Sequence, residues 1–267
     1  MAGNTPAGLV AAKAKVSEAN LKREARPEPK AATRTGFQHM TVADMRRKLL
    51  FFIFATALIC TKAGAQSPSV SPDQQLIQAA SRGDSALVKR LIAEGASVKA
   101  RDSGQRTALL AATQGNHVEA ARLFIAAGAD VNAKDAIEDS PYLLAGARGY
   151  LEILRLTLAA GADLKSTNRY GGTALTPACH YGHVETVREL LKTKIDVNHV
   201  NKLGWTGLLE AVILGDGGRA HTEIVRLLLA HGAKPDLADR EGVSPLTHAE
   251  RRGQRDIAAL LRAAGAR

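Results

Sequence analysis

The chain has 267 residues, which is enough for one large domain or two small ones. Of these residues 45% are hydrophobic but only 4% are aromatic. This composition favours thin, closely packed helices over a thick aromatic core. The formal charge is +10, but residues 1–65 hold 11 Lys and Arg against 4 Asp and Glu, which leaves 25 against 22 in residues 66–267. The basic charge therefore belongs mainly to the N-terminal segment and does not support a nucleic-acid partner. Cys60 lies in an apolar N-terminal run, so Cys179 stands alone in the rest of the chain, which excludes a fold stapled by disulfides.

Residues 1–44 are rich in Ala, Lys, Arg, Glu and Pro and show no apolar periodicity that could build a core, so they are predicted to be a disordered leader. A signal-like segment begins only after them. The simplest interpretation is that translation starts at Met45 or Met40 and that the leader is not translated. The alternative is a genuine basic leader, such as an organelle transit segment, although its four acidic residues count against it.

Residues 45–65 have the three parts of a cleavable signal peptide. A positive start from Arg46 to Lys48 precedes an apolar run from Leu49 to Cys60, and Ala63 and Ala65 are small residues typical of a cleavage site. The run is shorter than the roughly 20 residues that a membrane span needs. We expect cleavage after Ala65 and a periplasmic or secreted protein; a segment retained as an anchor is the alternative. Residues 66–72 are expected to be a linker.

The remaining chain, residues 73–267, is built from an internal repeat with a period of about 33 residues. A Gly-Ala pair marks the period and begins at Gly95, Gly128, Gly161, Gly232 and Gly265. Every step between these glycines equals one period except the step from Gly161 to Gly232, which contains a degenerate copy at Lys194 to Asp196 and five additional residues, Asp216 to Ala220. Because the repeat signals resume in register once these five are skipped, we expect the insertion to bulge from a helix–helix turn and to be dispensable for folding.

Each period is predicted to form two short helices. The first begins after a Thr or Ser that caps its free N–H groups, at Thr107, Ser140, Thr173, Thr206 and Ser244. The second is marked by apolar residues at helical spacing, such as Val184, Val187, Leu190 and Leu191. A unit of this length cannot bury its apolar face alone, so the units are expected to stack, with polar caps in the first and last units.

These motifs resemble ankyrin repeats. The Thr-Pro-Leu start of that repeat is matched by Thr107-Ala108-Leu109, Ser140-Pro141-Tyr142, Thr173-Ala174-Leu175, Thr206-Gly207-Leu208 and Ser244-Pro245-Leu246. Its Gly-His turn is matched by Gly182-His183, and its Gly-Ala-Asp-Val-Asn-Ala-Lys-Asp segment is matched letter for letter at Gly128 to Asp135. The family's His after Leu is replaced in every copy, by Leu110, Leu143, Thr176, Leu209 and Thr247, so we expect apolar packing to substitute for the inter-repeat hydrogen bonds of that His.

The resemblance implies an all-α solenoid of helix-turn-helix units with short β-hairpin loops. The units are expected at about 73–105, 106–138, 139–171, 172–204, 205–242 and 243–267. It also implies a protein-binding role, and the chain is similar to small exported bacterial ankyrin repeat proteins.

Three residues in the fourth unit could suggest chemistry. Cys179, His180 and His183 are of residue types that bind metals, but His183 occupies the Gly-His turn position and no further ligand has a fixed spacing to them. We therefore expect no metal site and an inert, buried Cys179. The sequence shows no Ser/His/Asp order, phosphate-binding glycine loop or paired-carboxylate signature, so we expect no cofactor and no catalysis. An enzyme that depends on His180 or His183 is the less favoured alternative.

Ankyrin proteins usually contact their partners through the hairpin tips and the exposed, concave side of the first helix. At matching positions the candidate partner-binding residues are Arg106, Arg148, Arg169, Tyr170, His180, Tyr181, Lys202, Leu203, Trp205, Ile213 and Leu214, and Ile137 belongs to the same set of positions. We expect Trp205 to be the anchor, with Tyr170 and Tyr181 beside it, since Trp and Tyr dominate interface energetics. Because Trp205 lies in the turn before Thr206, its truncation is expected to spare the fold.

The sequence thus predicts an exported, monomeric, non-catalytic protein–protein interaction module with no nucleic-acid partner and no membrane contact after signal cleavage. A secreted effector that acts on a host protein is the alternative, and it requires residues 1–44 to be a real leader.

Overall fold

The computed structural model describes residues 70–267, so the predicted leader, signal peptide and most of the linker lie outside the described residues. Within this part of the chain there are twelve helices and no β-strand, and the helices form six antiparallel pairs that we number as units 1 to 6. The pairs are α2 Pro72–Arg82 with α3 Ser85–Ala93, α4 Ala108–Gln114 with α5 Val118–Ala126, α6 Pro141–Arg148 with α7 Leu151–Ala159, α8 Leu175–His180 with α9 Val184–Leu191, α10 Gly207–Ile213 with α11 Arg219–Ala230, and α12 Pro245–Arg251 with α13 Arg255–Ala263.

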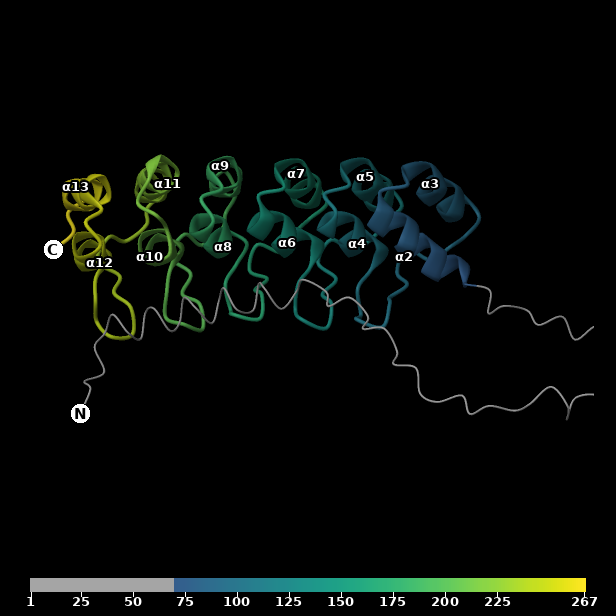
Figure 1. Ribbon diagram of the computed structural model, residues 1–267, viewed down its shortest axis with the longest axis horizontal. Coiled ribbons are helices and arrows are strands. Elements are labelled where there is room, and N and C mark those ends of the chain that lie inside the picture. Colours follow the sequence, from purple (N-terminus) through teal and green to yellow (C-terminus); the bar gives the residue numbers. More distant parts are fainter. Residues whose placement is uncertain (1–69) are drawn as a thin grey trace, which may run out of the picture. The chain divides into compact units, whose positions relative to one another are not determined.

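The pairs stack in one direction to form two rows of helices. The even-numbered helices α2 to α12, here called the inner helices, pack each on the next, and the odd-numbered outer helices α3 to α13 do the same. Loops between the units project on the side of the inner helices, as Figure 1 shows. Every unit therefore buries its apolar face only against its immediate neighbours, which confirms the expected all-α solenoid.

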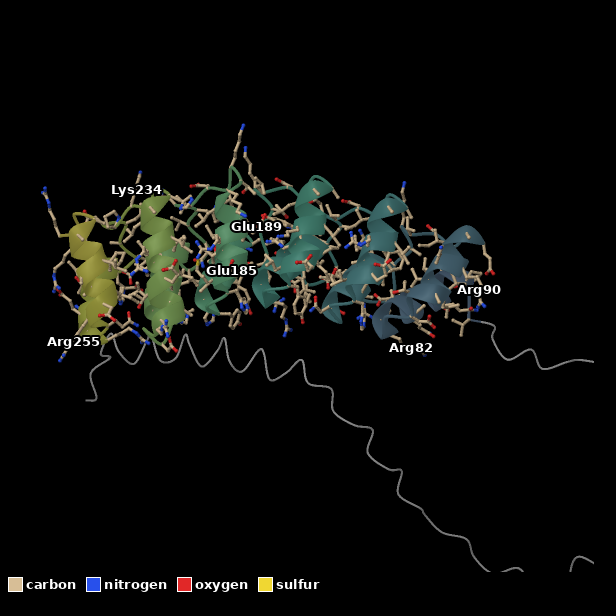
Figure 2. The ribbon with its side chains drawn as sticks, turned by 90° about the horizontal axis from the view of Figure 1, so that it is seen from above. Arg82, Arg90, Glu185, Glu189, Lys234 and Arg255 are labelled. Atoms are coloured by element: carbon tan, nitrogen blue, oxygen red, sulfur yellow. The ribbon has the colours of Figure 1, made fainter. Side chains whose placement is uncertain are left out.

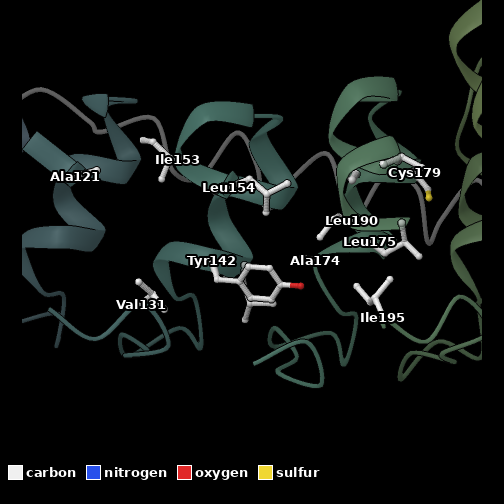
Figure 3. Packing of buried hydrophobic residues seen from close by; sticks show 14 of the residues in the cluster. Ala121, Val131, Tyr142, Ile153, Leu154, Ala174, Leu175, Cys179, Leu190 and Ile195 are labelled. Carbon is white, nitrogen blue, oxygen red and sulfur yellow. The ribbon is translucent and has the colours of Figure 1, made fainter. Parts of the chain in front are cut away.

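The core runs as one continuous layer between the two rows. Ile153 and Leu154 of α7, Leu175 of α8 and Leu190 of α9 are buried side chains in this layer (Figure 3). Small residues set how closely the inner helices approach: a Cβ added to Gly146 of α6 would lie 2.7 Å from the Cβ of Ala174, just before α8. The low aromatic content and the high Ala content of the chain follow from this thin layer.

Four of the five predicted caps form. The side-chain oxygens of Thr107, Ser140, Thr206 and Ser244 accept a hydrogen bond from the backbone N–H three residues on, at 3.2 Å in each case. The first unit has a cap of its own, Ser71, so its helix starts at Pro72, inside the segment expected to be linker.

The expected cap at Thr173 is wrong, and the reason is Pro177. In the five other units the N–H four residues after the cap donates to the cap carbonyl, as Glu210 does to Thr206 at 2.9 Å. Pro177 has no N–H and its ring clashes with the carbonyl four residues earlier, so Thr176 donates to that carbonyl instead. As a result α8 is only six residues long, and the Thr173 Oγ1 is buried without a partner among the described residues.

Hydrogen bonds also join successive units. The ring Nε2 of His117 lies 3.2 Å from the carbonyl of Ser81, one unit earlier, and His183 likewise bonds the backbone of Ala147. Asparagine side chains join the loops: Asn132 Oδ1 accepts from Asp163 N–H at 2.8 Å, and Asn198 accepts from Lys234 in the same way. These bonds come from positions other than the one at which the family carries its His.

The outer helices carry ion pairs that cross from unit to unit. Arg155 of α7 pairs with Glu189 of α9 at 3.2 Å, and Arg188 of α9 pairs with Glu223 of α11 at 3.3 Å. Figure 2 looks onto these helices and shows polar side chains along them, with Glu185 and Glu189 on α9. This face of the solenoid is therefore a solvated, charged surface.

The insertion between α10 and α11 differs from the expected bulge. Asp216, Gly217 and Gly218 lie in the turn, but Arg219 and Ala220 begin α11, which is twelve residues long as a result. The carboxylate of Asp216 also accepts from the Gly218 N–H at 2.8 Å. The last two residues of the insertion thus extend α11 at its N-terminal end. Across residues 70–267, none of the helices has the length and apolar character needed to cross a membrane.

Candidate protein-binding surface

Five five-residue hairpins line the inner side of the solenoid, and each is built in the same way. The first residue is Asp or Asn, and its Oδ1 accepts from the backbone N–H groups two and four residues on, at 2.9 to 3.0 Å. The hairpins start at Asp102, Asp135, Asn168, Asn201 and Asp239. They are held as hydrogen-bonded turns rather than strands, with one isolated bridge pair, Arg101 and Thr107, in the described chain. The five tips are therefore rigid supports for the side chains between the first and last residues.

The middle residue of three successive hairpins is apolar. These residues are Ile137, Tyr170 and Leu203, which follow one another at intervals of one repeat period, and we call them the apolar ridge. Ile137 is 44% exposed and Tyr170 is 39% exposed, whereas Leu203 is half-buried. Neighbouring tips are joined through their backbones, since the Lys202 N–H donates to the Tyr170 carbonyl at 2.9 Å. The ridge therefore follows the stacking direction of the units.

Cations flank the ridge at its centre. The guanidinium of Arg169 lies 5.0 Å from the centre of the Tyr170 ring and 3.4 Å from a carboxylate oxygen of Asp139. The ammonium of Lys202 donates to the Arg169 carbonyl at 3.0 Å, while the rest of its side chain is exposed. The aromatic ring of Tyr170 is thus held in place by a cation on one side.

A second exposed ring lies on the inner helices. Tyr181 at the end of α8 is 42% exposed and stacks on His180, with 4.2 Å between the ring centres and an angle of 14° between the planes. Burial, with a smaller contribution from His221, lowers the pKa of His180 to about 4, so the imidazole is neutral at pH 7. Tyr181 and His180 therefore form an uncharged aromatic pair on the inner side.

Two expected contact residues are buried and do not belong to this surface. Trp205 is 3% exposed and Ile213 is 2% exposed, so the prediction that Trp205 is an accessible anchor outside the core is wrong. The last hairpin position directs its side chain along the inner helix: at the matching position, Arg106 reaches Oε1 of Gln114 in α4 at 2.5 Å. An indole placed there is covered by protein, and its Nε1–H has no acceptor among the described residues.

Three other predicted contact residues lie away from the apolar ridge or are only half-exposed. Arg106 is half-buried and also pairs with Asp102 at 2.9 Å, which makes it part of its own hairpin. Arg148 is exposed on the last turn of α6, and Leu214 is half-buried after α10. The structure therefore brings Arg169, Tyr170, Lys202 and Leu203 together at the tips, and their role in binding stays a prediction.

Glu210, a buried carboxyl group on α10, was not among the residues predicted from the sequence. The residue is 7% exposed, and its Oε1 accepts from the Asn201 side-chain amide at 2.8 Å. Burial raises the pKa of Glu210 to about 8, although the bond from Asn201 opposes the shift. The sequence does contain one signal for Glu210. It lies four residues after a cap, and the matching residues of units 2, 3 and 4 are uncharged: Ala111, Leu144 and Pro177.

The residues considered for metal binding do not converge. Within residues 70–267 no three His, Cys, Asp or Glu side chains are grouped as metal ligands would be. Cys179 is buried and burial raises the pKa of its thiol, so the sulfur stays protonated and unreactive at neutral pH. His183 turns toward the backbone of Ala147, away from a shared site with Cys179.

Comparison with known proteins agrees with this architecture. A sequence model described as "Ankyrin repeats (3 copies)" matches residues 54–138, 142–239 and 196–267. The chain therefore belongs to the ankyrin repeat family, whose repeats are generally protein–protein interaction modules.

Particular known proteins are similar to the chain in sequence or in fold. The putative ankyrin repeat protein YahD of Escherichia coli (strain K12) is 55% identical over 58 residues, which span 22% of this chain and 29% of that protein. The crystal structure of an ankyrin repeat domain from Acinetobacter baumannii AYE is 57% identical with a TM-score of 0.71, covering 72% of this chain and 98% of that one. The ankyrin repeat domain of Bcl-3, described as a member of the IkappaB protein family, is 29% identical with a TM-score of 0.65, covering 72% and 86%.

Proposed function

We propose that the chain is a non-catalytic module that binds another protein through the hairpin tips and the inner helices. The observation that carries the proposal is the apolar ridge of Ile137, Tyr170 and Leu203. Two of its three side chains are exposed on hydrogen-bonded turns, in a solenoid whose outer face is charged. Contiguous exposed apolar side chains on a soluble protein are typical of interaction sites. Tyr181 on α8 adds a second exposed ring on the inner side.

The partner is expected to cover the ridge with apolar side chains of its own. Tyr170 and Tyr181 are rigid rings with polar edges, a combination that is frequent at the centres of interfaces. Arg169 and Lys202 beside Tyr170 provide the polar rim that surrounds such a centre. His180, Arg148 and Leu214 are peripheral candidates in this arrangement.

Site-specific photocrosslinking in the producing cell tests the proposal. A benzophenone side chain is placed at Tyr170 and, as a matched control, at the exposed Arg122 of the outer helix α5. We expect a discrete protein adduct from the Tyr170 position that disappears in an Ile137→Ser variant, and no such adduct from the Arg122 position. Equal adducts from both positions, or adducts that are unaffected by Ile137→Ser, would contradict binding through the ridge.

We further propose that the module acts as a monomer after export. The outer end of unit 6 carries exposed charged residues, including Glu250, Arg251 and Arg255, which disfavour stacking of another copy. Export is supported by the signal-like sequence at residues 45–65. Sedimentation equilibrium of the purified protein checks the monomer, and a concentration-dependent dimer would contradict it.

A further inference from the structure

Among the described residues, the buried carboxyl group of Glu210 accepts a hydrogen bond at only one of its two oxygens. Oε1 accepts this bond from the neutral amide of Asn201. The other oxygen, Oε2, lies 3.9 Å from His180 Nδ1, which is beyond hydrogen-bond distance. About 10% of the Glu210 side chain reaches solvent, so the group is desolvated but not sealed.

The solenoid does not require a carboxyl group at this position. The matching residues of units 2, 3 and 4 are Ala111, Leu144 and Pro177, which are small or apolar. In unit 6 the matching residue is His248, whose Nε2 lies 2.8 Å from a carboxylate oxygen of Asp239 in its own hairpin. His248 therefore has a partner able to carry the opposite charge, and Glu210 has only an amide.

No cation among the described residues balances Glu210. The inner helix α8 presents Cys179, a buried thiol, and His180, which burial keeps neutral at pH 7. From α11 and its turn come His221 and Asp216, which are bonded to each other at 2.8 Å, and α12 presents His248, already paired with Asp239. The nearby ammonium of Lys202 is directed to the Arg169 carbonyl. A buried carboxyl group without a cation is unfavourable in its charged form, so an incoming cation would find a strong and unoccupied partner.

We propose that Glu210 is the recognition site for a cationic side chain, an arginine or a lysine, of the partner protein. The inference rests on the proposed protein-binding function and adds the chemistry of one partner residue. A guanidinium or ammonium group that enters from the inner side donates to Oε2 of Glu210. His180 lies beside Glu210 and Tyr181 stacks on His180, so the same cation meets an uncharged aromatic pair. Binding favours the ionised form of Glu210, which releases its proton to solvent, because the bound cation provides the positive charge that the surrounding residues lack.

The competing explanation is a purely structural Glu210, which stays protonated and serves only to hold Asn201. The variant Glu210→Gln separates the two explanations, because the glutamine oxygen can still accept the bond from Asn201 but the side chain can no longer ionise. Glu138→Gln is the matched control, since Glu138 is an exposed carboxyl group on a hairpin of the same side. Thermal unfolding followed by circular dichroism verifies that both variants fold.

The experiment titrates the full chain with N-acetyl-arginine amide and follows the carboxyl carbon of Glu210 by NMR with isotopically labelled glutamate. We expect saturable binding that lowers the pKa of Glu210 by one unit or more and shifts the signals of His180 and Tyr181. The neutral isostere N-acetyl-citrulline amide should have no effect. Binding should be lost in Glu210→Gln and kept in Glu138→Gln. An unchanged pKa of Glu210 at saturating probe, or equal binding by Glu210→Gln, would overturn the proposal.

A second measurement separates this inference from the proposed function. If the photocrosslinked adduct at Tyr170 forms, we expect Glu210→Gln to reduce its yield at least tenfold. An undiminished adduct would refute the cation site and leave the protein-binding role intact. If no adduct forms at Tyr170, the proposed function fails, and the titration with N-acetyl-arginine amide still decides whether Glu210 recognises a cation.

Discussion

The ring Nε2 of His221 lies 2.9 Å from the carbonyl oxygen of His180, one unit earlier in the stack. The same contact joins His117 to Ser81, where the two residues are 36 apart in sequence, whereas His221 and His180 are 41 apart. The difference of five residues equals the insertion from Asp216 to Ala220. The contact between units is therefore preserved across the insertion, and Asp216 has become an additional partner of His221.

Removal of residues 216–220 is expected to keep the fold. The deletion places Gly215 directly before His221, which reproduces the Gly182-His183 turn of unit 4. Shortening a loop by five residues changes its closure entropy by about 1 kcal/mol or less. Urea unfolding should remain a single cooperative transition with a slightly lower midpoint, because the bond between Asp216 and His221 is lost. A biphasic transition would show that the residues added to α11 are needed to couple units 5 and 6.

Trp205→Ala is expected to destabilise the fold, in contrast to the expectation from the sequence. The indole is buried, and truncation of a buried Trp typically costs about 3 to 5 kcal/mol because it removes apolar contacts and leaves a cavity. Tyr170→Ala, on the exposed ridge, should change the free energy of unfolding by about 0.5 kcal/mol or less. Urea titrations of both variants check this pair, and equal losses of stability would contradict the placement of Trp205 in the core.

Glu210 should make the protein less stable as the pH rises. Its pKa is about 8 in the folded state against 4.5 as the ordinary value, so the folded state holds a proton that the unfolded state releases between these pH values. Stability is highest below pH 4.5 with respect to this group and falls as the pH rises to 8. Glu210→Gln should flatten that decline and be more stable than the parent protein at pH 8, by an amount on the order of a few kcal/mol.

His180 should make the protein less stable as the pH falls, which is the opposite of the effect of Glu210. Its pKa is lowered to about 4 from 6.5, so the unfolded state takes up a proton first and stability decreases as the pH falls from 6.5 to 4. The pH series for Glu210→Gln should therefore be compared with one for His180→Gln. If the stability of Glu210→Gln still declines above pH 6.5, the decline must be due to another group.

Processing after Ala65 is expected on export. The small residues Ala63 and Ala65 follow an apolar run with a positive start, which signal peptidases recognise. N-terminal sequencing of the exported protein should give Gln66 first. A mature protein that begins upstream of Met45 would rule out cleavage of this segment.

The sequence by itself determined the period, the units and most of the caps. Thr107, Ser140, Thr206 and Ser244 act on N–H groups three residues away, and the constant step between repeats makes every unit repeat the same local chemistry. The exception at Thr173 was also present in the sequence, because Pro177 lies four residues on and excludes a normal first turn. Such local interactions span one helical turn, so they can be predicted from the sequence without knowledge of the tertiary structure.

The tertiary structure alone decided which side chains remain on the surface. Trp205 and Tyr170 both lie in hairpins, yet one is covered and the other exposed, because coverage depends on the inner helices on which the hairpin rests. Glu210 accepts its hydrogen bond from Asn201 in its own hairpin, but it also lies beside His180 of the preceding unit, which only stacking brings there. Burial and the balance of charge are properties of the space between units. They cannot be predicted from the spacing of residues within one unit.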